Sequence, residues 1–473
     1  MKHLNIFSAF FLLLFISSVY SQHINSVDQI SSATAEEISK LIDFDVPYGV
    51  HFYKITYHTT GSDDMSDIAS GLIVIPDNDA QEFPLVIYHH GTSPAKDQVP
   101  SSLNLDYEAY AFIGASGFAV LAPDYLGMGD SRGFHPYVHR ETQARTSVDM
   151  LNAFHEWLKN EDYAVNDKLF LTGYSQGGHA SMSTHQELEL FHSAEFSVTA
   201  ATHLSGPYSV SGVMRDLMFS QLDYFFLGFI PYLILGYQEV YGNVYEDLSE
   251  IFQPEFITSV EAFYNGDINL IELTIALNFL AGQNYGNSYP VTLFNPDLVD
   301  DVTSDDDHPI NFILRENDTY NWAPQAPTRI FYCMGDEVVP FENSILVDSV
   351  LQANGAVDLI TENLNSDMSH GECAVPALLE TIEFFNGFVE TSAYPLAFEE
   401  EIILYPNPTD GKINISGPHG ITGYKAQVMD VSGKILLNQS LSSEINLDHL
   451  QSGIYFIRIS NRQEVSTHKI LLK

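Results

Sequence analysis

Gly173-Tyr174-Ser175-Gln176-Gly177-Gly178 is the stretch that decides the fold, because it places a G-x-S-x-G spacing between two predicted elements. The apolar run 168–172 before it is typical of a buried strand, and a helical pattern starts near His179. A serine at such a junction sits on a strained turn with its hydroxyl projecting, and the glycines let strand and helix backbones approach closely. The stretch therefore predicts a nucleophile elbow at Ser175, against the alternative of a glycine-rich turn with an ordinary serine.

The sequence offers two backbone donors for negative charge that develops near Ser175. The Gln176 N–H lies at the predicted helix N-terminus, where it can stabilise an oxyanion. Upstream, the strand-like run 83–90 ends in Gly91-Thr92, and a glycine at a strand end lets the next N–H point into a site. We expect the N–H groups of Gln176 and Thr92 to form a two-donor oxyanion hole.

An acid and a base follow the serine in the chain order typical of this elbow. One predicted strand leads into Asp336, and the last strand, near 358–363, leads through a polar loop to His370. His370 would take the proton of Ser175, while Asp336 would fix the imidazole tautomer and stabilise its charged form. Two acids compete with Asp336, one expected on the opposite side of its turn and one in the loop before His370: Glu337 and Asp367.

Residues 48–390 resemble a secreted member of the α/β-hydrolase superfamily, close to the secretory lipase family. The matching motifs are His90-Gly91-Thr92, 123–131 (Pro-Asp-Tyr-Leu-Gly-Met-Gly-Asp-Ser), the Ser175 elbow, 336–340 and His370-Gly371. The resemblance implies a second candidate for the oxyanion hole, because some secretory lipases use an aspartate at the position of Asp124. Thr92 is preferred because His-Gly directly precedes it. His135-Pro136-Tyr137 also resembles a family segment, but the residues assign it no chemistry.

Predicted strands and helices alternate along residues 22–389, which favours an α/β fold with a mostly parallel sheet and helices on both faces. The strands are expected at 51–57, 69–75, 83–90, 118–123, 168–174, 198–204, 328–334 and 358–363. About 120 residues, 207–325, interrupt the alternation and predict a mostly helical cap, because they are too many for a loop. Phe225, Phe226 and Phe229 are expected to wall an acyl pocket there, with an ordinary helical core as the alternative.

The charge balance excludes two classes of partner. The 473 residues hold 62 Asp and Glu against 19 Lys and Arg, a net charge of −43. Such a surface repels nucleic acid and anionic lipid headgroups. No cofactor is indicated, and a catalytic metal is disfavoured because Pro136 spoils a helix between His135 and His139. The acidic run 300–307 is interpreted as a solvated charged loop, with calcium ligation as the alternative.

The first residues are typical of a secretory signal peptide. Met1-Lys2-His3 is basic, 4–16 is apolar, and 17–21 offers small residues for cleavage before Gln22. We therefore expect residues 1–21 to be removed on export, with an uncleaved anchor as the alternative.

The chain has two cysteines, and export makes a disulfide permissible. Cys333 precedes Asp336 by three residues, and Cys373 follows His370 by three. If Asp336 and His370 meet, both cysteines lie beneath neighbouring turns, and a bridge would hold the acid and base loops together. Two buried free thiols are the alternative.

A different pattern begins after a linker at 390–401 that ends in three glutamates. Short alternating strands with glycine turns follow in 402–473, which is typical of a small all-β sandwich. This segment resembles the C-terminal sorting domain of the bacterial type IX secretion system, on Tyr405-Pro406-Asn407-Pro408, 430–434 and 450–455. The resemblance implies recognition by that secretion machinery and export to the cell surface or beyond. A carbohydrate-binding sandwich is the alternative.

These expectations favour a secreted serine hydrolase that cleaves carboxylic esters, an esterase or a lipase, through an acyl-enzyme on Ser175. The expected small partner is an ester substrate, lipid esters included. A serine peptidase of the same fold is the alternative, because triad geometry does not fix the leaving group. A binding protein that keeps the fold without catalysis is the third hypothesis.

Overall fold

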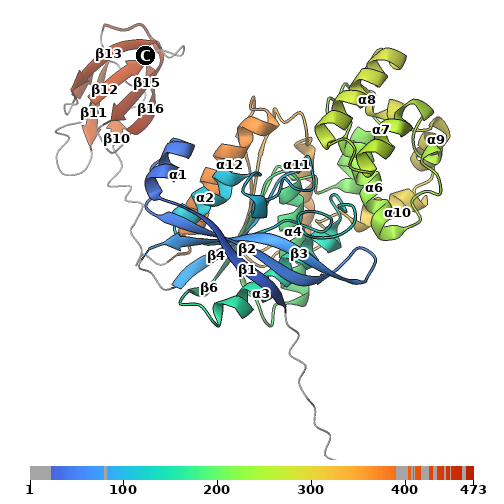
Figure 1. Cartoon of the computed structure of the whole chain (residues 1–473). Coiled ribbons are helices and arrows are strands. Elements are labelled where there is room, and N and C mark those ends of the chain that lie inside the picture. The colour runs from blue at the N-terminus through green and yellow to red at the C-terminus, as the bar shows by residue number, and fades with distance from the viewer. Residues whose placement is uncertain are drawn as a thin grey trace, which may run out of the picture. The chain divides into compact units, whose positions relative to one another are not determined.

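The computed structural model describes residues 23–78, 82–389, 403–405, 409, 411–416, 425–429, 434–440, 444–447, 449–460 and 465–473 (Figure 1). The chain divides into two compact units, Met1–Val389 and Glu390–Lys473. The expected signal peptide, the expected linker and parts of the sorting-domain motifs (406–408 and 430–433) lie outside the described residues. The first unit holds the Ser175 elbow, and the second holds the short strands.

A nine-stranded sheet forms the centre of the first unit, in the order β1-β2-β3-β5-β4-β6-β7-β8-β9. Its strands are β1 (Ile24–Ala33), β2 (Gly49–Thr60), β3 (Ser66–Asp77), β4 (Glu82–His89), β5 (Ala119–Pro123), β6 (Ala164–Gly173), β7 (Val198–Leu204), β8 (Thr328–Cys333) and β9 (Leu359–Asn365). Strands β1, β2, β3 and β5 pair antiparallel, and the pairs from β5 to β9 are all parallel. The mostly parallel sheet confirms the predicted fold class.

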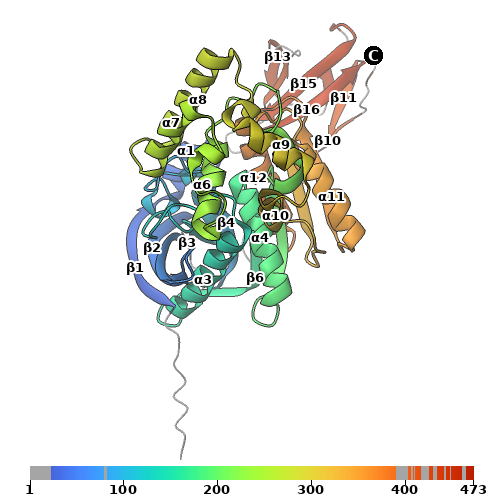
Figure 2. The same cartoon turned by 90° about the vertical axis from the view of Figure 1, so that its right-hand side faces the viewer.

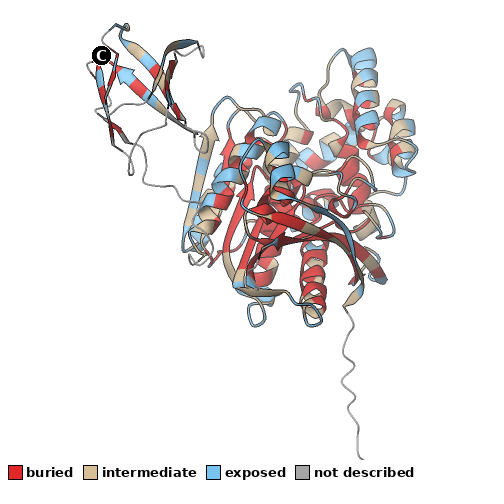
Figure 3. Cartoon of the chain, turned by 60° about the vertical axis from the view of Figure 1, so that its left-hand side comes forward, coloured by how far each residue is buried: buried red, intermediate tan, exposed pale blue. Residues whose placement is uncertain are grey.

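Helices cover both faces of this sheet (Figure 2). The helices α1 (Ala35–Ile42), α2 (Tyr107–Ala115) and α12 (His370–Asn386) pack on one face, where Phe170 of β6 stacks on Phe385 of α12. The helices α3 (Arg140–Leu158), α4 (Gln176–Phe191) and α11 (Glu342–Asn354) pack on the other face. The central strands are therefore buried from both sides (Figure 3), which explains their near-continuous apolar runs.

The cap is helical, as predicted, and lies in the chain between β7 and β8. Its helices are α5 (Arg215–Met218), α6 (Phe229–Tyr241), α7 (Pro254–Tyr264), α8 (Leu270–Tyr285), α9 (Pro296–Ser304) and α10 (Pro309–Glu316), preceded by a π-helical turn at Val210–Met214. They enclose a hydrophobic core of their own. The acidic run is not wholly a loop: Asp300 and Asp301 lie inside α9, and only the later aspartates follow it.

The second unit consists of two small antiparallel sheets, in the orders β10-β11-β14 and β13-β12-β15-β16. Its strands are β10 (Ile403–Tyr405), β11 (Lys412–Ser416), β12 (Lys425–Met429), β13 (Ile435–Ser440), β14 (Glu444–Asn446), β15 (Gly453–Ser460) and β16 (Val465–Leu472). Ile413, Val428 and Ile457 are among the side chains buried in one core of this unit. This arrangement confirms the expected all-β class. In the described part of the chain, no helix is both long enough and apolar enough to span a bilayer.

Candidate active site

Ser175 occupies the sharp turn between β6 and α4, in a conformation that side chains rarely adopt. Its φ of 60° and ψ of −122° lie outside the regions favoured by non-glycine residues. The turn is as tight as the elbow requires, because a Cβ built on Gly177 would lie 2.0 Å from the His89 carbonyl oxygen of β4. Only glycine fits there. The backbone N–H of Ser175 also donates to the Leu204 carbonyl at the end of β7, at 2.9 Å.

Asp336 and His370 meet although 34 residues separate them. His370 Nδ1 lies 2.6 Å from Asp336 Oδ2, and the Asp336 side chain is only 1% exposed. The other carboxylate oxygen, Oδ1, accepts from the backbone N–H groups of Val338 and Val339 at 2.9 and 2.8 Å. The carboxylate is thus held in one orientation and faces the imidazole. This arrangement sets the tautomer, with the proton on Nδ1.

His370 lies beside the elbow. It is the first residue of α12, and its carbonyl accepts from the Tyr174 hydroxyl at 2.5 Å. The rings of Tyr174 and His370 are 4.9 Å apart. His370 is therefore packed against Tyr174, the residue that directly precedes Ser175.

The two competing acids do not reach the imidazole of His370. Glu337 Oε2 accepts from the backbone N–H of His370 at 3.0 Å, which caps the start of α12. Asp367 is exposed, and its backbone N–H donates to the Asn365 side chain. Of the three acids, Asp336 is the one that hydrogen-bonds the His370 ring.

The two cysteines form a disulfide and are not the two buried free thiols of the alternative interpretation. Cys333 ends β8 and Cys373 lies in the first turn of α12, with Cα atoms 6.1 Å apart. The bridge connects β8, which Asp336 closely follows, to α12, which begins at His370.

Two backbone donors remain available beside the elbow. The N–H of Gly91 is already engaged, since it donates to Asp106 Oδ2 at 3.0 Å. Among the described residues, no acceptor is found for the N–H groups of Thr92 and Gln176. The Thr92 side chain is held separately, by a 2.9 Å contact between its hydroxyl and that of Tyr137.

Asp124, the other oxyanion candidate, is occupied elsewhere. It is fully buried, and its carboxylate accepts from the Ser70 hydroxyl at 2.6 Å and from the Ser101 N–H at 3.0 Å. Burial raises its pKa above the usual range for an aspartate. These bonds tie the turn after β5 to β3 and to the short helix at Pro100–Ser102, which is a structural role.

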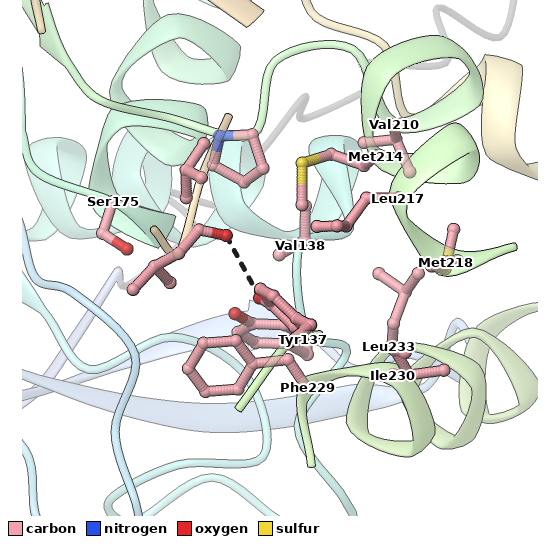
Figure 4. A pocket seen from close by; sticks show the side chains of 14 residues that line it. Tyr137, Val138, Ser175, Val210, Met214, Leu217, Met218, Phe229, Ile230 and Leu233 are labelled. Atoms are coloured by element: carbon pink, nitrogen blue, oxygen red, sulfur yellow. Dashed lines mark hydrogen bonds between the residues drawn. The ribbon is translucent and has the colours of Figure 1, made fainter. Parts of the chain in front are cut away.

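An apolar cavity opens beside Ser175 (Figure 4). In this view Ser175 lies at one end, and Met218 and Leu233 lie at the other. The lining residues come from the segment after β5, the elbow, the cap and the turn of Asp336: Tyr137, Val138, Ser175, Pro207, Val210, Met214, Leu217, Met218, Tyr224, Phe229, Ile230, Leu233, Val338 and Val339.

The predicted wall of aromatic residues is only partly correct. Phe229 lines the cavity. Phe226 packs against the cap core without lining the cavity, and Phe225 is 59% exposed. Phe229 begins α6, whereas Phe225 and Phe226 lie in the loop that leads to this helix.

Tyr137, Val338 and Val339 also line the cavity, and none of them was expected there, although each lies inside a motif quoted above. His135 and His139, considered for a metal, serve hydrogen bonds instead. His135 Nδ1 lies 2.7 Å from the Leu126 carbonyl, and His139 caps α3 by accepting from the Thr142 N–H.

Two family models match parts of the chain. One, described as a secretion system C-terminal sorting domain, matches residues 403–473. The other, described as the prolyl oligopeptidase family, matches residues 104–205, which include the elbow. No curated protein matches the chain significantly. The sorting-domain match indicates export by type IX secretion to the cell surface or the extracellular space.

Several solved structures are similar to the chain. A Legionella pneumophila protein assigned as a hydrolase is 25% identical, with a TM-score of 0.71, and the match covers 79% of this chain and all of that one (100%). The rice cell wall degrading esterase LipA of Xanthomonas oryzae is 24% identical, with a TM-score of 0.67 and coverage of 77% and 96%. Candida antarctica lipase A in its closed state is 15% identical, with a TM-score of 0.59 and coverage of 78% and 83%.

The first unit therefore has the α/β-hydrolase fold, and the chain ends in a type IX sorting domain. The elbow, together with the partial family match and the structural neighbours, supports a serine hydrolase.

Proposed function

We propose that this secreted α/β hydrolase cleaves carboxylic esters through an acyl-enzyme on Ser175. The observation that carries the proposal is that Ser175 lies in the wall of an apolar cavity and directly follows Tyr174, which contacts His370 of the hydrogen-bonded pair His370 and Asp336. A nucleophile with an apolar chamber beside it suits a substrate whose acyl part is a hydrocarbon.

Each of these residues has a separate role in ester hydrolysis. His370 takes the proton of Ser175 through Nε2, while its Nδ1–H donates to Asp336. The Ser175 oxygen attacks the ester carbonyl, and the resulting oxyanion accepts from the N–H groups of Gln176 and Thr92. The protonated imidazole then passes its proton to the leaving alcohol, which leaves the acyl group on Ser175. A water molecule, deprotonated by His370, attacks this acyl-enzyme and releases the carboxylic acid.

The composition of the cavity favours an ester over a charged or polar substrate. No Asp, Glu, Lys, Arg or His is among its lining residues, and the only lining side chains with a hydroxyl are Ser175, Tyr137 and Tyr224. Each methylene that enters such a chamber gains about 0.8 kcal/mol from leaving water. The names of two structural neighbours, an esterase and a lipase, agree with this substrate class.

A serine peptidase is the second candidate, and one observation favours it. The prolyl oligopeptidase model matches residues 104–205, a range that includes Ser175. The matched range excludes Asp336, His370 and the cap, and so excludes most of the cavity wall. The match therefore supports the elbow more than it supports a peptide substrate.

A substrate panel tests the proposal. The purified protein is assayed on p-nitrophenyl esters of two to sixteen carbons, roughly the range of common acyl chains, and on peptide p-nitroanilides, with Ser175→Ala as the matched blank. We expect the wild-type protein to hydrolyse the esters and not the anilides, and we expect Ser175→Ala to hydrolyse neither. Cleavage of anilides without esters would favour the peptidase, and no turnover of either class would favour a binding protein.

A further inference from the structure

The segment His135-Pro136-Tyr137 contacts the side chains of both residues that are proposed to donate to the oxyanion. We propose that His135 and Tyr137 are positioning residues, which hold Gln176 and Thr92 so that their backbone N–H groups face the same point. This inference rests on the proposed function, and it assigns a role to a motif that no step of the mechanism above uses.

His135 anchors Gln176. His135 Nε2 lies 2.8 Å from Gln176 Nε2, and both side chains are buried. His135 Nδ1 lies 2.7 Å from the Leu126 carbonyl, which can only accept, so Nδ1 carries the ring proton. Burial lowers the pKa of His135 to about 3, which keeps the ring neutral. His135 Nε2 is therefore an acceptor, and the Gln176 amide donates to it.

The ring of His135 is fixed by its neighbours. Tyr125 stacks on it at 5.8 Å between ring centroids, and Tyr232 of α6 packs edge-on at 5.7 Å. An imidazole held on two sides and bonded at both nitrogens has one orientation. The acceptor for Gln176 is therefore stationary, and Gln176 is the residue whose N–H follows the nucleophile directly.

Tyr137 anchors the side chain of Thr92. Its hydroxyl lies 2.9 Å from Thr92 Oγ1, and its ring stacks on Tyr232 at 4.5 Å with an interplanar angle of 5°. Tyr137 also lines the cavity, so it stands between the acyl site and the donor loop. The contact fixes the side chain of the residue after Gly91, where the backbone has no strand partner to hold it.

The cap helix α6 packs closely against this segment at Gly236. A Cβ on Gly236 of α6 would lie 2.7 Å from the Tyr137 nitrogen and 2.9 Å from the His135 carbonyl oxygen. Backbone therefore packs on backbone, with no side chain between them. One short segment thus contacts the cap helix on one side and both donor residues on the other.

The His135–Gln176 and Tyr137–Thr92 contacts can each be removed by substitutions that keep the size of the side chain similar. Tyr137→Phe and Thr92→Val each delete one partner of the hydroxyl contact, and His135→Phe and Gln176→Met each delete one partner of the other contact. The matched control is Tyr237→Phe, which removes the hydrogen bond that Tyr237, a buried tyrosine of α6, donates to the Val138 carbonyl at 3.2 Å and which involves neither Thr92 nor Gln176. Unfolding temperatures are measured for all five variants.

The readout is transition-state binding. A trifluoromethyl ketone forms a tetrahedral adduct with a serine nucleophile, so its Ki reports the oxyanion hole, whereas KM for a short ester reports ground-state binding. We expect kcat to fall and Ki to rise in parallel by roughly tenfold in each variant, with KM changed less than about twofold. Tyr137→Phe combined with Thr92→Val should cost no more than either change alone. The Tyr237→Phe control should keep kcat and Ki.

Two results would overturn the inference. One is a loss of thermal stability in the four variants with kcat and Ki unchanged, as expected for packing residues. The other is full additivity of the paired changes. The ketone inhibits serine esterases and serine peptidases alike. The kcat, KM and Ki of each variant are therefore compared with those of the wild type on whichever substrate the wild-type protein cleaves. A protein that cleaves neither substrate and binds no ketone would instead refute the proposed function.

Discussion

A disulfide joins Cys333, the last residue of β8, to Cys373, in the first turn of α12, across a sequence separation of 40 residues. The acid of the candidate triad lies just after the first cysteine, and the base lies just before the second. A single cross-link therefore limits how far Asp336 and His370 can separate when the turn or the helix fluctuates.

Removal of this cross-link should lower stability more than activity. For a closed loop of this length, the double change Cys333→Ser/Cys373→Ser should cost about 4 kcal/mol of unfolding free energy. The bond between His370 and Asp336 does not depend on sulfur, so kcat on a short ester at 25 °C should change less than about threefold. Denaturant unfolding and initial rates test this prediction. A large loss of kcat in the folded variant would show that the bridge sets the triad geometry.

The three triad residues should act as a unit. Ser175→Ala and His370→Ala should each lower kcat on the order of 10³-fold or more, and the double variant should be no slower than the worse single variant. Asp336→Asn should also be slow, because an amide cannot accept from two backbone N–H groups and from the imidazole at the same time. Steady-state kinetics with circular dichroism as a fold control test this. An Asp336→Asn variant of near-normal rate would assign the role to another acid.

The far end of the cavity should limit acyl length. Leu233 lies opposite Ser175 in the cavity, so Leu233→Trp should shorten the longest ester accepted while leaving short esters within about threefold. The exposed Phe225 serves as control, and Phe225→Ala should leave the profile unchanged. Rates across a series of p-nitrophenyl esters provide the measurement. A profile that shifts in the Phe225 variant, and not in the Leu233 variant, would place the acyl chain elsewhere.

Buried histidines should make stability fall in acid. Burial lowers the pKa of His139 to about 3, while the unfolded chain titrates near the ordinary value of about 6.5. Between these values only the unfolded state binds the proton, so stability is full above pH ~6.5 and is lost as the pH falls toward ~3. Replacing His139 by Asn, another good N-cap residue, should reduce the loss between pH 7 and pH 5 by on the order of 1–2 kcal/mol.

Denaturant unfolding at both pH values measures this difference. The control is His58→Asn, because His58 is exposed and gives up little water on folding. Equal pH dependence of the His139 variant and the wild type would mean that His139 is charged in the folded protein.

The central strands could be predicted because burial on both faces makes them apolar. β1 could not be, since it is an edge strand in which Asp28, Gln29 and Ser32 are exposed and no apolar run marks it. The helix α8 shows the opposite problem. Ile271, Ile275 and Phe279 are 58%, 57% and 66% exposed, while Leu273 and Leu277 on its other face are buried. Apolar residues on both faces give no reliable signal for which face packs inward.

Part of the candidate site could also be predicted. The turn at Ser175 and the contact between Asp336 and His370 were expected, because each residue follows a strand within a short motif and the sheet brings the ends of its parallel strands to one edge. The cavity wall could not be, because its residues depend on how the cap folds back over the sheet. Phe229 and Phe225 are four residues apart and equally aromatic, yet tertiary packing places one in the wall and leaves the other exposed.

Deletion of 402–473 should separate export from catalysis. The strands of this segment bury their own core, including Ile413 and Val428, and the chain divides at Val389, before the segment begins. The purified truncated protein should therefore keep its specific activity on a short ester, within about twofold. In its native host it should collect in the periplasm, because the segment that the type IX machinery recognises is gone. Full-length Ser175→Ala is the matched control, since it should reach the cell surface without activity. Activity and antibody detection in each cell fraction give the result, and a truncated enzyme that is exported normally would contradict the sorting role.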